Sequence, residues 1–297
     1  GLASFVKSHK IVEELLLMGT SISDDGLEHL KALPKLRGLR VGTIGTTKVT
    51  NAGLENLKGL NNLTRLGLTG SGVTDAGLMQ LKERIGLKVL LLKGTKISNA
   101  GLVNLKGMVG LRKLDIGDTE ITDAGLVHLK DLTKLEKLVL RGSKVADEGL
   151  VYLKGLSNLR WLLLDRTDIS DDGLIHLVNL KGLKYLTLAG TNISDKGVAH
   201  LKELTNLESL NLLFTDVTDH GVSKLKEALP NCNIATGIPS ATSIFGRYDN
   251  NNDGKLTRGE IQEISEYFRG RLVLADDNSD GAITKEELEA HLEQLRR

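Results

Sequence analysis

Several things are scarce in this chain of 297 residues, and each scarcity excludes a class of protein. A single Cys excludes an internal disulfide framework. No apolar run approaches the ~18 residues of a membrane-spanning helix, so membrane insertion is not expected. A formal net charge of +1 is too small to indicate nucleic-acid binding. Aromatic residues make up only 3% of the chain, so any core must be built from aliphatic side chains.

Glycine, in contrast, recurs at a fixed place. Nine glycines occupy equivalent positions: Gly26, Gly53, Gly77, Gly101, Gly125, Gly149, Gly173, Gly197 and Gly221. The interval is 24 residues from Gly53 onward, and the first interval is 27 because residues 41–47 carry an insertion. A fixed period of this length predicts a solenoid. Because a solenoid offers a long surface instead of one deep pocket, binding is favoured over catalysis.

The unit at residues 121–143 illustrates what each repeat contains. Leu129 and Leu132 follow the first leucine after the glycine by three and six residues, which places them on one face of a short helix. Leu138 and Leu140 then alternate with one other residue, so they point to the same side of a strand. A Ser or Thr followed by an acid before the glycine, as at Thr122-Asp123 and Ser170-Asp171, predicts a helix N-cap.

These units resemble the leucine-rich repeat family over about residues 11–234, as nine full repeats and a partial N-terminal one. Their form is similar to repeats abundant in planctomycete-type bacterial proteins. The resemblance implies an α/β solenoid, a right-handed horseshoe with a parallel sheet on the concave face and helices on the convex face. The family often has Asn or Cys after LxLxx, where this chain has Thr or Ser. We expect a stacked ladder of hydroxyls to replace the Asn ladder.

The composition divides the chain into parts. We expect the solenoid at residues 1–234, ending in a C-terminal cap at 222–234. A linker rich in small residues follows at 235–243, and a small all-α module occupies 244–297. Because the chain opens inside a repeat with Gly1 and not Met, we expect it to be a piece of a longer protein.

Two segments of that module, 249–260 and 276–287, fit D-x-[DN]-x-[DN]-G-x5-E and resemble EF-hand loops. Calcium is a hard cation that takes about six to eight oxygen ligands, which this spacing supplies from one loop. The expected ligands are Asp249, Asn251, Asp253, Lys255, Thr257 and Glu260 in the first loop, and Asp276, Asn278, Asp280, Ala282, Thr284 and Glu287 in the second. Lys255 and Ala282 would contribute main-chain carbonyls. We therefore predict two Ca²⁺ sites, with Leu256 and Ile283 in contact between the loops.

Only residues 261–275 separate the loops, against about 24 residues in a standard pair. Ile261, Ile264, Phe268 and Leu272 lie at helical spacing, which allows one shared helix or two short ones. So short a connection favours a static, calcium-stapled module over a sensor that opens.

Side chains that flank each LxL pair should point outward from the concave face. Among them are the only Trp of the chain and several neighbours in adjacent repeats, which form a candidate partner-binding patch: Trp161, Tyr185, Val139, Leu163, Arg141 and Asp165. Aromatic residues flanked by charges are typical of binding hot spots. The alternative is that the repeat surface drifts and the Trp lies there by chance.

No catalytic motif is present, so we expect no enzyme activity. The sequence favours a monomeric calcium-binding scaffold that recognises a protein, peptide or other ligand through its concave face, in an extracytoplasmic or secreted setting. Two alternatives stay open. The chain could be a purely structural, calcium-stabilised rod, or the recognition arm of a longer enzyme whose catalytic domain is missing.

Overall fold

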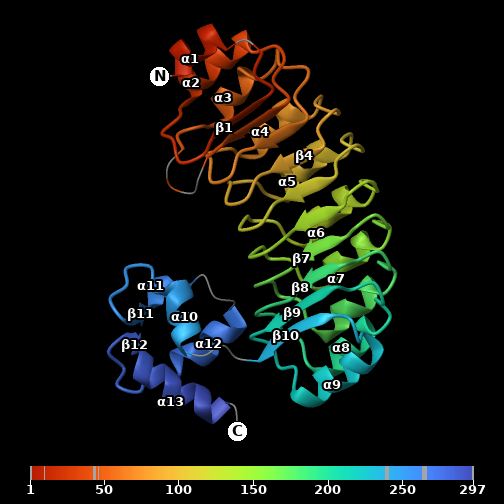
Figure 1. The fold of residues 1–297 in the computed structure, drawn as a ribbon, viewed down its shortest axis with the longest axis vertical. Coiled ribbons are helices and arrows are strands. Elements are labelled where there is room, and N and C mark those ends of the chain that lie inside the picture. Colours follow the sequence, from red (N-terminus) through yellow and green to blue (C-terminus); the bar gives the residue numbers. More distant parts are fainter. Residues whose placement is uncertain are drawn as a thin grey trace.

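The computed structural model describes residues 2–9, 11–42, 45, 47–237, 241–262 and 266–295. Strands β1 to β10 form one parallel sheet in chain order. The sheet bends into an arc with the strands on its inner side and the helices on its outer side (Figure 1). The predicted leucine-rich-repeat solenoid is thereby confirmed.

The sheet strands are β1 (Glu14–Leu17), β2 (Gly38–Val41), β3 (Arg65–Gly67), β4 (Val89–Leu91), β5 (Lys113–Asp115), β6 (Lys137–Val139), β7 (Trp161–Leu163), β8 (Tyr185–Thr187), β9 (Ser209–Leu213) and β10 (Asn233–Gly237). The helices of this part are α1 (Leu2–Ser8), α2 (Asp24–Glu28), η1 (His29–Ala32), α3 (Asn51–Glu55), α4 (Asp75–Leu81), α5 (Asn99–Leu102), η2 (Val103–Leu105), α6 (Asp123–Leu126), η3 (Val127–Leu129), α7 (Asp147–Leu150), η4 (Val151–Leu153), η5 (Asp171–Leu177), α8 (Asp195–Leu201) and α9 (Asp219–Ala228), where η marks 3₁₀ turns.

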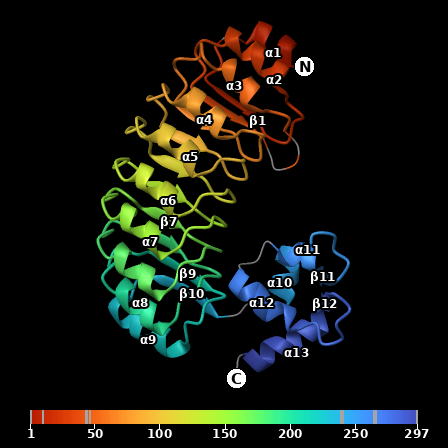
Figure 2. The same ribbon diagram turned by 180° about the vertical axis from the view of Figure 1, so that it is seen from behind.

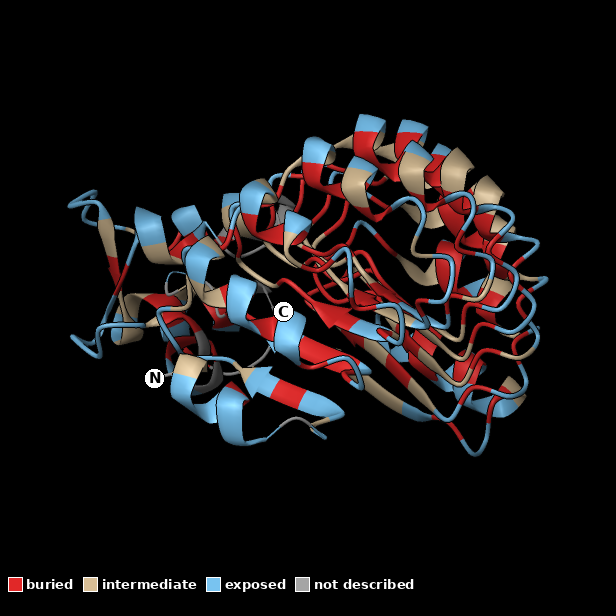
Figure 3. Cartoon of the chain, turned by 90° about the horizontal axis from the view of Figure 1, so that it is seen from above, coloured by how far each residue is buried: buried red, intermediate tan, exposed pale blue. Residues whose placement is uncertain are grey.

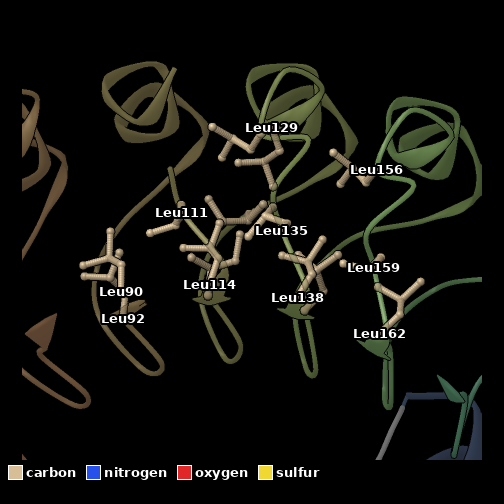
Figure 4. Close-up of a cluster of buried hydrophobic side chains, with 14 of the residues drawn as sticks. Leu90, Leu92, Leu111, Leu114, Leu129, Leu135, Leu138, Leu156, Leu159 and Leu162 are labelled. Carbon is tan, nitrogen blue, oxygen red and sulfur yellow. The ribbon is translucent and has the colours of Figure 1, made fainter. Parts of the chain in front are cut away.

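The core is a thin aliphatic layer between the strands and the outer helices. Leucines from successive repeats stack there, as Leu114, Leu138 and Leu162 do in Figure 4, and these three are at most 1% exposed. Seen from above, buried residues run through the inside of the solenoid while the loop tips are exposed (Figure 3). Burying a leucine contributes roughly 1.5–3 kcal/mol, so this repeated layer stabilises the rod along its length.

The repeat glycine exists because the preceding repeat approaches it closely. Asp75 at the start of α4 accepts hydrogen bonds from the backbone N–H (2.7 Å) and the hydroxyl (2.6 Å) of Ser98, the N-cap residue of the next repeat. The same carboxylate lies against Gly101, where a Cβ would stand 3.0 Å from Asp75 Cγ and closer still to Oδ1. Equivalent contacts join Asp147 to Ser170 and Asp171 to Ser194. We call this arrangement the inter-repeat clamp.

The expected row of hydroxyls inside the turns is present, and its hydrogen bonds stay within each repeat. The hydroxyls of Thr95 and Thr119 are buried, but each donates to a carbonyl oxygen three residues earlier in its own turn, at 2.7 and 2.6 Å. A carboxylate or amide side chain reaches farther than a hydroxyl, so the clamp residue makes the contact to the next repeat.

Residues 222–234, expected as the cap, contain the end of α9 and the start of β10. Strand β10 continues to Gly237 and pairs with β9, with Ile234 opposite Leu210. The next helix, α10 (Ala241–Tyr248), starts at Ala241. The segment expected as the linker, 235–243, therefore contains strand and helix at its ends, and its residues 238–240 lie outside the described part.

The C-terminal module comprises α10, β11 (Lys255–Thr257), α11 (Arg258–Ile261), α12 (Glu266–Val273), β12 (Ala282–Thr284) and α13 (Lys285–Leu295). It lies on the concave side of the arc beside the C-terminal strands (Figures 1 and 2). Phe214, in the turn after β9, is 6% exposed and belongs to the module's own apolar core together with Ile244 and Tyr248. The module is thus packed against the last repeat.

No helix within the described ranges combines the length and the apolar character needed to cross a bilayer.

Candidate functional site

The first candidate site is the loop that follows α10. Its backbone wraps around its own acidic side chains, because Asp249 accepts from the N–H groups of Asp253 (3.2 Å) and Gly254 (3.0 Å). Gly254 has φ +77°, a left-handed conformation that glycine adopts without strain. Asn251 Oδ1 also accepts from Asp253 N–H, and Asp253 Oδ1 accepts from Lys255 N–H. These bonds hold the side-chain oxygens on one side of the turn.

The second loop, before α13, repeats this geometry. Asp276 accepts from the N–H groups of Asp280 (3.1 Å) and Gly281 (3.0 Å), and Asn278 Oδ1 accepts from Asp280 at 2.8 Å. Gly281 has φ +87°. Two segments of different sequence therefore adopt one loop conformation, which shows that the D-x-N-x-D-G pattern determines it.

A glutamate closes each loop from the following helix. Glu260 Oε2 accepts from the N–H (3.0 Å) and hydroxyl (2.8 Å) of Thr257, and Glu287 makes the same pair of bonds to Thr284. Glu260 Oε1 turns back to the N–H of Asn250. The N–H of Thr257 and then its hydroxyl lower the pKa of Glu260, so this carboxylate is charged at neutral pH.

The donor set fits calcium better than a transition metal. In the described residues, no three His, Cys, Asp or Glu side chains are gathered closely enough to hold a metal, and this includes the carboxylates of the two loops. Each loop instead offers carboxylate, amide, hydroxyl and main-chain carbonyl oxygens, the mixture of hard ligands that calcium accepts in large number. The loops thus have the turns and the oxygen donors of a calcium site, with the carboxylates bonded to main-chain N–H groups.

The two loops contact each other as the sequence predicts. Strands β11 and β12 pair antiparallel, with Leu256 opposite Ile283. Both side chains are buried, at 1% and 3% exposure. Ile261 and Leu272 of the connecting segment are also buried, whereas Ile264 and the side chain of Phe268 lie outside the described residues. Among described residues, the connection contains two helices, α11 and α12.

The second candidate site is the concave face of the sheet. The parallel register aligns outward side chains in two rows, one residue per repeat. The first row runs through Val89, Lys113, Lys137, Trp161 and Tyr185, and the second runs through Leu91, Asp115, Val139, Leu163 and Thr187. Neighbouring members are about 4.8 Å apart. The six residues predicted as a partner patch fall on the strands of these rows or two residues after them.

Trp161 and Tyr185 stack face to face, with ring centroids 5.4 Å apart and an interplanar angle of 1°. The hydroxyl of Tyr185 donates to Glu208 at 2.8 Å, and Lys184 donates to the same carboxylate at 2.5 Å. The hydrogen bond to Glu208 raises the pKa of Tyr185. Both rings are half-buried, so this stacked pair, which we call the aromatic platform, is held in place with part of its surface facing solvent.

Arg141 and Asp165 form a fixed pair beside this platform. Two nitrogens of Arg141, Nε at 3.0 Å and Nη2 at 2.9 Å, donate to Asp165 Oδ2, which also accepts from the hydroxyl of Thr187 at 2.7 Å. Asp165 is only 4% exposed. Its role in the structure is therefore to orient Arg141, whose side chain remains half-exposed.

Sequence reasoning missed a groove toward the N-terminal side of the platform. Its volume is about 360 Å³, and its lining includes the cations Arg40, Lys93, Lys113, Lys137 and Arg141. Val139 and Leu163 of the predicted patch also line it. Asp115 is the one acidic residue of that lining, and burial raises its pKa above the usual range. The row of Lys113 and Lys137 was readable from the sequence, but the contribution of Arg40, which lies against Gly67 and also lines the groove, was not.

Comparison with protein families agrees with both parts of the chain. A model described as Leucine Rich repeat matches residues 111–129, 131–154 and 203–226. A model described as EF hand matches residues 242–265 and 272–292. A search of curated proteins found no match.

Among solved structures, an internalin C2 from Listeria monocytogenes is similar, with 26% identity and a TM-score of 0.58, covering 80% of this chain and 92% of the internalin. The leucine-rich-repeat ectodomain of the Arabidopsis thaliana receptor kinase GASSHO1/SCHENGEN3, in complex with CASPARIAN STRIP INTEGRITY FACTOR 2, has 16% identity and a TM-score of 0.53. The match covers 77% of this chain and 28% of that ectodomain, so it shows the fold alone. Repeats, sheet and loops together show that this chain carries leucine-rich repeats followed by a C-terminal EF-hand pair.

Proposed function

We propose that this chain is a non-catalytic recognition scaffold that binds a protein or peptide on its concave face, with calcium in both loops keeping the C-terminal module folded against the last repeat. The observation that carries the proposal is the stacked pair of Trp161 and Tyr185 beside the groove. A rigid aromatic platform loses little conformational entropy on binding, which suits a hot spot.

Calcium occupancy is tested by calorimetric titration of chelator-stripped protein with magnesium present. Asp249→Ala and Asp276→Ala each remove the first ligand of one loop, so the wild type should show two sites and each variant one. Sites near micromolar affinity would favour a regulated switch, and sites near 10⁻⁴ M or weaker would favour permanent occupancy outside the cytoplasm. Absence of binding heat and of any change in melting temperature would contradict the calcium part.

The recognition face is tested with peptides selected from a random library on the calcium-loaded protein. Their binding should be lost in Trp161→Ala/Tyr185→Ala. The matched control is Val103→Ala/Ile175→Ala, which removes two exposed apolar side chains, 45% and 51% exposed, from η2 and η5 on the convex side. If both double variants bind alike, the concave proposal is wrong and the structural-rod alternative gains support.

A further inference from the structure

The strongest unexplained feature is a pair of like charges on the concave face. Lys113 and Lys137 occupy directly paired positions of β5 and β6, and neither forms a salt bridge within the described part of the chain. Like charges at directly paired strand positions repel each other, which destabilises the sheet. A ligand that supplies negative charge would relieve this repulsion, so binding an acidic ligand here is energetically favourable.

The surroundings of the pair add to the positive potential. The groove lining contains five Lys or Arg residues and one acid. Two of the cations are already matched, since Lys93 pairs with Asp118 at 3.1 Å and Arg141 with Asp165. Burial raises the pKa of Asp115 and outweighs the hydrogen bond that its carboxylate accepts from Gly117 N–H and the attraction of Lys93 and Lys137, so one acid faces five cations in this groove. Arg40 forms no salt bridge among described residues and lies over Gly67 toward Leu91.

The side chains of the first row change from charged to aromatic toward the C-terminal repeats. Lys137 is followed in register by Trp161 and then by its stacking partner Tyr185. Val139 and Leu163 of the second row lie beside them. A ligand that follows the row therefore meets cations first, then an aromatic platform with aliphatic side chains next to it.

We infer that the groove binds an acidic segment of polypeptide in extended conformation, with carboxylates over Lys113 and Lys137 and an apolar or aromatic side chain on the platform of Trp161 and Tyr185. This inference rests on the proposed concave-face function and specifies its ligand. The row from β4 to β8 crosses four inter-strand steps of ~4.8 Å, about 19 Å in all, which an extended chain spans in about six residues. The aliphatic neighbours favour a peptide over a polyanionic sugar, which has no apolar side chains to bury there.

The test compares labelled peptides of about ten residues by fluorescence anisotropy on the calcium-loaded protein. One peptide carries Glu on one side of a central Tyr-Leu pair, and its counterpart carries Gln in place of Glu. The wild type should bind the Glu peptide about 10-fold or more tightly than the Gln peptide, with an advantage that shrinks as salt is raised. Lys113→Glu/Lys137→Glu should abolish that advantage.

The matched control is Lys106→Glu/Lys130→Glu, which makes the same charge change in the same two repeats on exposed convex positions and should leave the preference intact. Thermal unfolding of both variants checks that they fold. Equal binding of the two peptides, or equal effects of the two double variants, would overturn the inference.

A heparin fragment that binds more tightly than the Glu peptide, through the same lysines, would also overturn it in favour of a sugar. If library-selected peptides need Trp161 but are neutral and insensitive to Lys113→Glu/Lys137→Glu, the concave face is a peptide site and only the acidic preference is wrong. If no selected peptide depends on Trp161, both proposals fail.

Discussion

The inter-repeat clamp makes a sharp prediction at Gly101. Changing it to Ala should ordinarily stabilise a helix by about 1 kcal/mol. Here the added methyl group would overlap the carboxylate of Asp75, which is held by the N–H and hydroxyl of Ser98 at 2.7 and 2.6 Å. Displacing that carboxylate weakens two charge-assisted hydrogen bonds, worth about 1.5 kcal/mol each in a partly buried place. We expect Gly101→Ala to be destabilising by about 2 kcal/mol.

A double-mutant cycle separates this cause from backbone strain. Asp75→Ala removes both Asp75 atoms that the methyl group would meet and leaves Leu78 Cδ1 at 3.1 Å from the added Cβ, so Gly101→Ala in that background should become close to neutral. The coupling between the two changes should then be about 2 kcal/mol by these magnitudes. Gly86 serves as the control because a methyl group added there would meet no atom within 4 Å, so Gly86→Ala should change stability by less than about 0.5 kcal/mol.

The assay is urea unfolding followed by far-UV circular dichroism and by Trp161 fluorescence. Coincident transitions would justify a two-state reading. The reasoning is refuted if Gly101→Ala costs the same free energy with and without Asp75, because the glycine would then be required for its backbone and not for the neighbouring repeat.

Three further outcomes are expected. Chelation of calcium should unfold the C-terminal module, because a module of this size is marginally stable without metal, while the solenoid keeps its circular dichroism. If the solenoid unfolded together with the module, the two parts would not be independently stable. Phe214→Ala should weaken docking of the module by about 3 kcal/mol, measured by urea unfolding of the calcium-loaded protein, with the repeats unaffected. Asp115→Asn should stabilise the protein more at pH 7 than below the usual Asp pKa of 3.8, because a raised native pKa means that the wild type loses stability as pH rises. Urea unfolding at both pH values measures this difference, and an equal gain in stability at both would contradict the burial argument.

Much of the fold follows from the period of the sequence. Leu138 and Leu140 alternate in a pattern that only a strand satisfies, and both are fully buried as expected. The loop pairing of Leu256 with Ile283 was equally accessible, because the EF-hand pattern fixes where the short strands lie. The two calcium sites and the partner patch remain predictions for the titration and peptide experiments to test.

The sequence did not reveal which polar residue joins the repeats. Thr95 and Asp75 both recur at regular positions, and a hydroxyl and a carboxylate can each make a ladder. Side-chain length decides which residue joins the repeats. The hydroxyl of Thr95 donates within its own turn, whereas the longer carboxylate side chain of Asp75 reaches the N-cap of the next repeat. The docking of the module was also only partly readable. Phe214 has φ +60° at a position where Asp118 and Arg166 of earlier repeats also have positive φ, and its ring belongs to the module core.

The clamp and the concave face are mechanically connected. Each clamp fixes the spacing of two neighbouring repeats on the helix side, and the parallel register then fixes the spacing of their outward side chains on the strand side. Lys113 and Lys137 are therefore held at a separation that their repulsion opposes, and Trp161 is held parallel to Tyr185 before any ligand arrives. A ligand that fits these positions has little reorganisation to overcome, so its affinity depends directly on matching charge and shape.

Loosening the clamp beneath the groove, at Asp123, should thus weaken peptide binding without altering any residue on the binding face, because Asp123 accepts from the N–H of Ala146 in the repeat that follows. Unchanged affinity in a folded Asp123→Ala variant would show that the strands alone set the face.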